Sequence, residues 1–83
     1  MKTLLYFGAS WCHTCEELDP IIADIVLESG VKFFKYDVEE APKIAEKYKI
    51  NVIPCIIILD EEGNQIKKLI GKKSKEEILD SLK

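Results

Sequence analysis

The chain has 83 residues, of which 47% are hydrophobic and 33% are charged. A chain of this size buries roughly 60 to 65% of the surface that its unfolded form exposes, so we expect one compact domain over residues 1–83 rather than disorder. The 12 basic and 15 acidic residues give a formal net charge of -3, which provides no reason to expect a nucleic-acid partner. The apolar runs are far shorter than the ~18 to 20 residues that span a bilayer, so we expect no membrane partner either.

The first half of the chain predicts a helix between two strands. Residues 3–7 and 31–36 are short runs rich in aromatic and β-branched side chains, which are typical of strands. Between them, apolar side chains recur with helical spacing on one face, at Leu18, Ile21, Ile22, Ile25 and Val26. Gly30 is a suitable end for this helix. A crossover of this length predicts that the two strands run parallel with a right-handed connection.

The second half predicts a helix, a hairpin and a last helix. Pro42 suits the first turn of a helix, because its fixed backbone angle is helical and its missing N–H needs no partner there. Residues 55–59 and 65–70 flank a polar turn that contains a glycine, which predicts an antiparallel hairpin. Ser74 and Glu77 have the spacing of a capping box at the start of the last helix. The predicted order is βαβαββα.

The number and spacing of the cysteines indicate the chemistry of the protein. Three cysteines are an odd number, and two of them lie too close together to staple a small domain effectively. The segment Trp11-Cys12-His13-Thr14-Cys15 falls between the first predicted strand and the first predicted helix, where free backbone N–H groups and the helix dipole favour negative charge. We therefore expect a lowered pKa for Cys12, which would attack disulfides, and expect Cys15, one turn further along, to resolve them. A protonated His13 would stabilise the same thiolate.

This pattern predicts dithiol-disulfide exchange without a metal or an organic cofactor, in the reducing cytoplasm. The alternative from another class is a metal-binding or partner-docking module whose cysteines do not cycle. Cys12, Cys15, Cys55 and His13 could supply four zinc ligands, but the second closely spaced ligand pair of a structural zinc site is missing. We interpret Cys55, which lies in an apolar strand, as a small buried side chain rather than a third redox thiol.

The motifs together resemble the thioredoxin family over residues 4–82. They are Trp-Cys-x-x-Cys at 11–15, Pro20 five residues after the second cysteine, Ile53-Pro54 before a hydrophobic strand and Gly71 after the last strand. The resemblance implies an α/β three-layer sandwich with helices on both faces of a four-stranded mixed sheet, in the strand order 2-1-3-4. It also implies that a cis peptide bond precedes Pro54, which would lie against the active-site sulfurs, and that the backbone of Ile53 pairs with substrate. Trp11 would either contact substrate or shield the site.

The chain departs from the family's pattern in ways that bear on mechanism. It begins at the strand before the active site, so we expect a minimal, glutaredoxin-sized version of the fold. The dipeptide between the cysteines is His13-Thr14, where thioredoxins mostly carry Gly-Pro. Tyr6 occupies the place of the buried carboxylate that assists proton transfer at the second cysteine, whereas Lys35 occupies the place of the lysine that accompanies it. The proton acceptor for Cys15 therefore stays open.

The function implied by the resemblance is that of a protein-disulfide reductase or electron carrier in cell redox homeostasis. Its partners would be protein disulfides and an external electron donor such as a thioredoxin reductase, and the protein would be a cytoplasmic monomer. A glutathione-dependent glutaredoxin is the alternative within redox chemistry. Glutaredoxins usually carry Gly-Gly after the last strand and Pro-Tyr between the cysteines, whereas this chain has Gly71-Lys72 and His13-Thr14.

Overall fold

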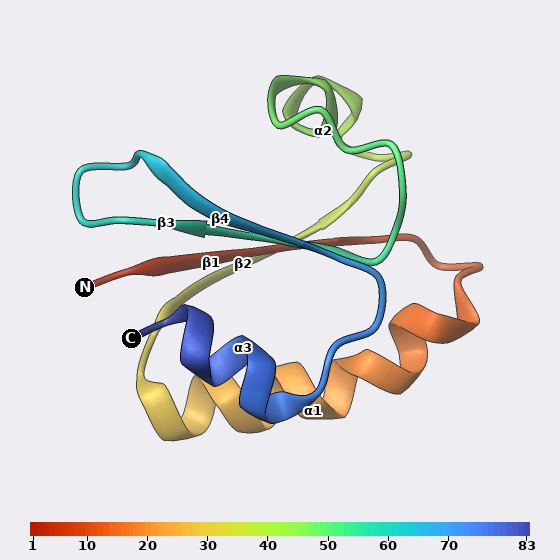
Figure 1. Ribbon diagram of the computed structural model, residues 1–83. Coiled ribbons are helices and arrows are strands. Elements are labelled where there is room, and N and C mark those ends of the chain that lie inside the picture. Colours follow the sequence, from red (N-terminus) through yellow and green to blue (C-terminus); the bar gives the residue numbers. More distant parts are fainter.

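The computed structural model describes all 83 residues and has the predicted βαβαββα order (Figure 1). Its elements are β1 (Thr3–Gly8), α1 (His13–Ser29), β2 (Lys32–Asp37), α2 (Pro42–Lys47), β3 (Cys55–Leu59), β4 (Gln65–Ile70) and α3 (Lys75–Ser81). The strands form one sheet in the order β2-β1-β3-β4. β1 is parallel to β2, and the other two strand pairs are antiparallel. The predicted sheet order and strand directions are confirmed.

Helices cover both faces of the sheet, with α1 and α3 on one face and α2 on the other (Figure 1). Successive side chains of a strand point to opposite faces. Leu4 and Tyr6 of β1 therefore join the core under α1 and α3, whereas Leu5 and Phe7 join the core under α2. The first core also contains the apolar face of the helices, formed by Leu18, Ile22, Ile25 and Ile78. The predicted three-layer arrangement follows from this alternation.

The ends of α1 and α3 form as the sequence predicts. Gly30 takes the left-handed conformation at the end of α1, with φ of 68°, and donates its N–H to the carbonyl of Val26 at 3.0 Å. A residue with a Cβ would be strained in that conformation. At the start of α3, Ser74 and Glu77 form both hydrogen bonds of the capping box. These local signals fix where the two helices that cover the larger core begin and end.

Three strand boundaries differ from the sequence prediction by one residue. Val31 precedes β2 rather than starting it, because its N–H donates to the Ser29 hydroxyl at 3.2 Å at the end of the helix. At the other end, Gly8 and Asp37 extend the parallel pairing of β1 and β2 by one residue. The sheet thus continues up to the loop that carries the first cysteine.

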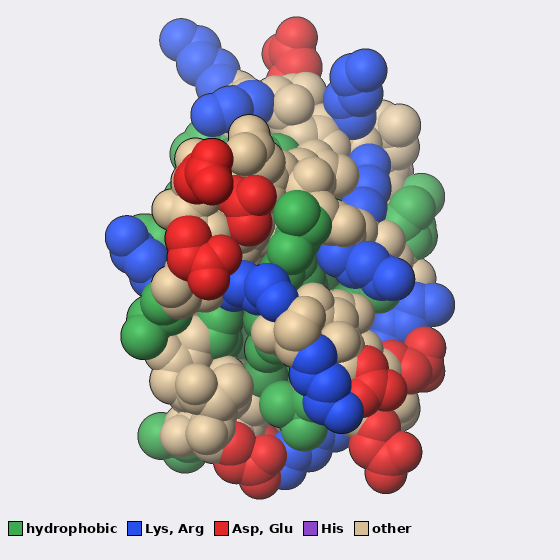
Figure 2. Space-filling model, turned by 60° about the vertical axis from the view of Figure 1, so that its left-hand side comes forward, with side chains coloured by type: hydrophobic (Ala, Val, Ile, Leu, Met, Phe, Trp, Pro, Cys, Tyr) green, Lys and Arg blue, Asp and Glu red, His purple; other side chains and the backbone are tan.

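Charged side chains of both signs are spread over the face shown in Figure 2, with hydrophobic side chains between them. Two ion pairs connect α3 and the segment before it to α1: Lys72 lies 2.8 Å from Glu17, and Lys75 lies 2.7 Å from Glu28. The hydrogen bond from Lys72 lowers the pKa of Glu17. Such exposed pairs add little to stability because water screens them. None of the helices combines the length and the apolar character that crossing a membrane requires.

Candidate active site

Cys12 lies at the start of α1 as its N-cap residue, with extended backbone angles of φ -91° and ψ 109°. Its Sγ accepts a hydrogen bond from the backbone N–H of Cys15 at 3.2 Å. The two cysteines form a disulfide, and their Cα atoms are 5.2 Å apart. Unpaired N–H groups and the positive end of the dipole at a helix start stabilise negative charge. The expected placement of the pair is confirmed, and a Cys12 thiolate would form where the backbone favours it.

Both cysteines are nearly buried, and Cys12 is the more accessible of the two. The exposed fractions are 8% for Cys12 and 4% for Cys15. Gly8, at the end of β1, lies directly against the second sulfur: a Cβ on Gly8 would come within 3.1 Å of the Cys15 Sγ. Gly8 is not among the predicted site residues, although a glycine four residues before the Cys-x-x-Cys motif is a visible signal for a close approach.

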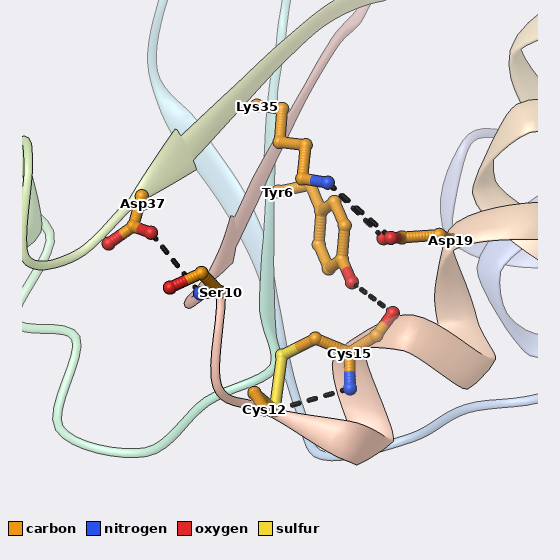
Figure 3. Close-up of polar contacts among 7 residues, drawn as sticks. All are labelled: Tyr6, Ser10, Cys12, Cys15, Asp19, Lys35 and Asp37. Atoms are coloured by element: carbon orange, nitrogen blue, oxygen red, sulfur yellow. Dashed lines mark hydrogen bonds and ion pairs between the residues drawn. A yellow bond between two sulfur atoms is a disulfide. The ribbon is translucent and has the colours of Figure 1, made fainter.

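Tyr6 anchors the strand to the helix. Its side chain is 1% exposed, and its hydroxyl donates a hydrogen bond to the carbonyl of Cys15 at 2.9 Å (Figure 3). Burial raises the pKa of the Tyr6 phenol far above its ordinary value, and the nearby carboxylate of Asp19 acts in the same direction. The phenol therefore stays protonated at physiological pH. Tyr6 holds α1 against β1 and cannot serve as a proton acceptor.

Lys35 lies beside Tyr6 in the parallel register of β1 and β2. Its Nζ is 5.6 Å from the centre of the Tyr6 ring and 3.5 Å from each carboxylate oxygen of Asp19. Figure 3 shows the Lys35 amino group directed at Asp19, one helical turn after Cys15. Lys35 thus lies near the site, as expected, but its partner Asp19 was not predicted. The signal that could have found Asp19 is its spacing of four residues from Cys15, which places both on one face of the helix.

A cavity of about 290 Å³ adjoins the second cysteine. Cys15, Asp19 and Lys35 all contribute to its wall, and so does the backbone around Gly8. The remaining charged groups on the wall are Glu16, Asp37 and Glu40. The cavity is therefore mostly acidic, with one lysine, and both the resolving cysteine and carboxylates of α1 line it.

Trp11 and His13, on either side of Cys12, both point toward solvent. Trp11 is 64% exposed, and its indole N–H donates to the carboxylate of Glu39 in the loop after β2. The His13 side chain is 93% exposed, and its Nδ1 lies 3.7 Å from Glu16. No hydrogen bond joins the His13 ring to either sulfur. A charge so exposed is strongly screened by water, so we expect the effect of His13 on the thiolate to be small.

The peptide bond between Ile53 and Pro54 is cis, as the resemblance implies. Antiparallel pairing places Cys55, the first residue of β3, opposite Phe7 near the end of β1. Ile53 and Pro54 therefore lie at the end of the sheet where β1 leads into the active-site loop. The carbonyl of Pro54 accepts a hydrogen bond from Gly71 at 2.8 Å, which ties this segment to the end of β4.

Cys55 lies on the other face of the sheet from Cys15. It is 1% exposed and packs with Phe7 and Ile57 in the core under α2. Burial raises the pKa of its thiol, although the charge of Lys68 acts in the opposite direction. The four residues that we considered as zinc ligands are thus not assembled, and no group of three or more His, Cys, Asp and Glu side chains could hold a metal ion.

Known proteins resemble this chain in both sequence and structure. The thioredoxin family profile matches residues 1–83. A thioredoxin from Rickettsia bellii is 35% identical over 82 residues, which are 96% of this chain and 77% of the relative. An H-type thioredoxin from Fagopyrum esculentum is 35% identical over 74 residues, which are 88% of this chain and 62% of the relative. The crystal structure of a thioredoxin from Nicotiana alata matches with a TM-score of 0.90 and 26% identity, over 98% of this chain and 70% of that one.

The chain is shorter than the plant relatives that it matches. It spans 62% of the length of the Fagopyrum esculentum thioredoxin and 64% of the length of thioredoxin H5 from Arabidopsis thaliana. The family profile nevertheless extends over the whole chain, and the matched segment includes the cysteine pair at the helix start. The chain therefore belongs to the thioredoxin family.

Proposed function

We propose that this protein is a thiol-disulfide oxidoreductase that reduces protein disulfides, with Cys12 as the attacking and Cys15 as the resolving thiol. The observation that carries the proposal is the position of the Cys12 sulfur at the start of α1, where it accepts the N–H of Cys15. A thiolate is the nucleophile in disulfide exchange, and such a position favours it. Cys12 is also the more accessible of the two sulfur-bearing residues, which suits the one that meets substrate first.

The proposed reaction has two exchange steps. The Cys12 thiolate attacks a substrate disulfide, forms a mixed disulfide and releases the first substrate thiolate. Cys15 then loses its proton and attacks the Cys12 sulfur, so that the Cys12-Cys15 disulfide forms and the second substrate thiolate leaves. Two electrons pass from the protein to the substrate in each cycle. An external dithiol donor must then reduce the pair again, and no metal or organic cofactor on this chain takes part.

Protein substrates would bind along the segment that precedes β3. Neither the N–H nor the C=O of Ile53 has a hydrogen-bond partner within the chain, so both are free to pair with an extended substrate segment. Exposed apolar side chains lie at the same end of the sheet: Val52 is 52% exposed, and Ile70, which pairs with the first residue of β3, is 50% exposed. We propose that Ile53, Pro54 and the exposed ring of Trp11 contact the substrate around its disulfide.

The finer assignments are part of the same proposal. We expect the electron donor to be a thioredoxin reductase, the protein to act as a monomeric electron carrier, and its compartment to be the cytoplasm. The test is reduction of insulin disulfides, first with dithiothreitol and then with either NADPH and thioredoxin reductase or glutathione as the donor. Turnover with the reductase supports the proposal. Turnover with glutathione alone would indicate a glutaredoxin-like enzyme, and no turnover together with stoichiometric zinc in the purified protein would indicate a metal-binding module.

A further inference from the structure

The resolving step needs a base for Cys15. Its thiol must lose a proton before it can attack the mixed disulfide, because only the thiolate is a nucleophile. The Cys12 sulfur receives a backbone N–H, but no hydrogen bond reaches the Cys15 sulfur, and Cys15 is 4% exposed. Tyr6, the nearest polar side chain on β1, donates its proton to the Cys15 carbonyl and cannot accept another. The base must therefore come from another element.

The cavity beside Cys15 offers four carboxylates, three of which are poorly suited. The two oxygens of Asp37 accept backbone N–H bonds, one from Ser10 at 3.2 Å and one from Glu39 at 2.8 Å. Glu16 is 66% exposed in its side chain and pairs with a histidine on the outer face of α1. Glu40 lies in the exposed loop after β2. Each of these groups is either engaged in holding a loop or directed to bulk water.

Asp19 differs from these three in position and partner. It follows Cys15 by four residues on α1, so both side chains lie on the same helix face, and both line the cavity. Lys35 holds its carboxylate from β2, at 3.5 Å from each oxygen. A volume of about 290 Å³ has room for several waters at about 30 Å³ each, and the charged wall provides their hydrogen-bond partners. A short water chain can therefore connect the Cys15 thiol to Asp19.

We propose that Asp19, positioned by Lys35, accepts through cavity water the proton that Cys15 loses when it resolves the mixed disulfide. This inference rests on the proposed function and adds the proton path to it. The Cys15 S–H bond breaks, the proton passes through water to the Asp19 carboxylate, and the Cys15 thiolate forms a bond to the Cys12 sulfur. The bond between Cys12 and the substrate sulfur breaks at the same time. The departing substrate thiolate then takes the proton back from Asp19 through the same water, so the carboxylate is restored.

Gly8 and Lys35 act on this path as positioning residues. A side chain at Gly8 would come within 3.1 Å of the Cys15 sulfur and would crowd the space between β1 and the cavity. Lys35 pairs with Asp19 from β2, as Figure 3 shows, and the Asp19 side chain is 43% exposed. Replacement of Lys35 by Met should therefore slow the resolving step less than replacement of Asp19 itself, because the carboxylate remains on the chain.

The test separates the two exchange steps with 5,5'-dithiobis(2-nitrobenzoate), in single turnovers of the reduced protein. Attack by Cys12 releases one coloured thiolate, and resolution by Cys15 releases the second. The measurement uses the Cys55→Ala background, so that only two thiols remain. In Asp19→Asn we expect the first release to stay within about 2-fold and the second to slow about 10-fold or more at pH 6. The deficit should shrink as pH rises, since the thiol then ionises without a base, and added acetate should partly restore the rate.

The control variants identify the carboxylate and test for a structural effect. Glu16→Gln and Glu40→Gln remove the other carboxylates that are free of backbone bonds, and His13→Gln removes the imidazole beside Cys12; each should leave the second release within about 2-fold. Asp19→Glu should retain most of the rate. An unchanged second release in Asp19→Asn, or an equal loss in Glu16→Gln or Glu40→Gln, would overturn the inference. If the unsubstituted protein gives no first release, the proposed function fails, which is a different result.

Discussion

Cys12 and Cys55 are both nearly buried, at 8% and 1% exposure, yet their surroundings differ. Cys12 lies at the start of α1, where a backbone N–H reaches its sulfur. Cys55 begins β3 on the sheet's other face, packed by Phe7 and Ile57, and burial raises the pKa of its thiol. The comparison shows that a polar backbone environment, more than exposure, distinguishes a thiol placed for chemistry from one that fills a core.

The largest expected effect is on turnover of a protein disulfide. Cys12→Ser should abolish insulin reduction, because it removes the nucleophile itself. Cys55→Ala and Cys55→Thr should keep turnover within a few fold of the parent, since Cys55 lies on the opposite face of the sheet. The three variants are measured with the same donor and at equal folded concentration. Residual activity in Cys12→Ser, or its loss in Cys55→Ala, would break the distinction between the two environments.

The alkylation rates of Cys12 and Cys55 should also differ, although by a smaller factor than the loss of turnover in Cys12→Ser. In the reduced folded protein at pH 7 we expect iodoacetamide to modify Cys12 about 100-fold faster than Cys55. Because the pKa of Cys55 is raised, its thiolate forms at a higher pH than that of an ordinary thiol. The rate of its modification should therefore increase only at high pH. Peptide mapping by mass spectrometry gives both rates in one sample. In denaturant the difference should disappear, and rapid labelling of Cys55 in the folded state would refute its structural role.

Much of this comparison could be predicted from the sequence because its signals are local. The Cys-x-x-Cys spacing, the strand before it and the helix after it place Cys12 at a helix start without knowledge of the tertiary structure. The left-handed Gly30 and the capping box at Ser74 are equally local, and the structure confirms both. The cis bond at Pro54 came from the family resemblance and is also confirmed.

The parts that were missed depend on contacts between distant elements. The pairing of Asp19 with Lys35 joins α1 to β2, 16 residues apart, and the contact of Trp11 with Glu39 joins two loops. Such contacts depend on strand register and on side-chain direction, which hydrophobic periodicity does not report. His13 was given a role on proximity in sequence alone. Its neighbour Glu16 and its exposure appear only when the first turn of the helix is built.

Loss of the Tyr6 hydroxyl should have a moderate effect on stability. Tyr6→Phe removes the buried hydrogen bond to the Cys15 carbonyl and should lower the free energy of unfolding by about 1 kcal/mol at pH 7. Tyr36→Phe is the matched control, because the Tyr36 hydroxyl makes no hydrogen bond within the chain, and it should change little. Urea denaturation measures both. An equal decrease in the free energy of unfolding of the two variants would show that the hydrogen bond between Tyr6 and Cys15 adds no stability of its own.

The same variant tests how the free energy of unfolding depends on pH, and the raised pKa of Tyr6 fixes the sign of that dependence. The folded pKa of Tyr6 is raised above its unfolded value, so its contribution to stability is complete below the ordinary tyrosine pKa of about 10 and is lost as pH rises beyond it. The protein that keeps Tyr6 should therefore lose more stability than Tyr6→Phe between pH 9 and about 11. Both proteins carry Cys55→Ala, because the raised pKa of that thiol acts in the same direction. Parallel pH profiles would contradict burial of the phenol.

The smallest effect should come from His13. Its side chain is 93% exposed and lies beside Glu16 rather than a sulfur, so His13→Gln should change turnover by no more than about 2-fold between pH 6 and 8. Glu16→Gln provides the control for the ion pair. A larger change with His13→Gln alone would mean that the imidazole, rather than the backbone N–H of the helix, governs the reactivity of Cys12.

The central claim is that Cys12 attacks and Cys15 resolves, while Cys55 stays outside the chemistry. The direct measurement is mass spectrometry of the Cys15→Ser protein after incubation with a disulfide-bonded substrate, because this variant keeps the attacking thiol but cannot complete the second exchange. The account predicts a mixed disulfide that maps to Cys12, dissolves with dithiothreitol and is absent from the Cys12→Ser protein. An adduct that maps to Cys55, or trapping that survives the loss of Cys12, would contradict it.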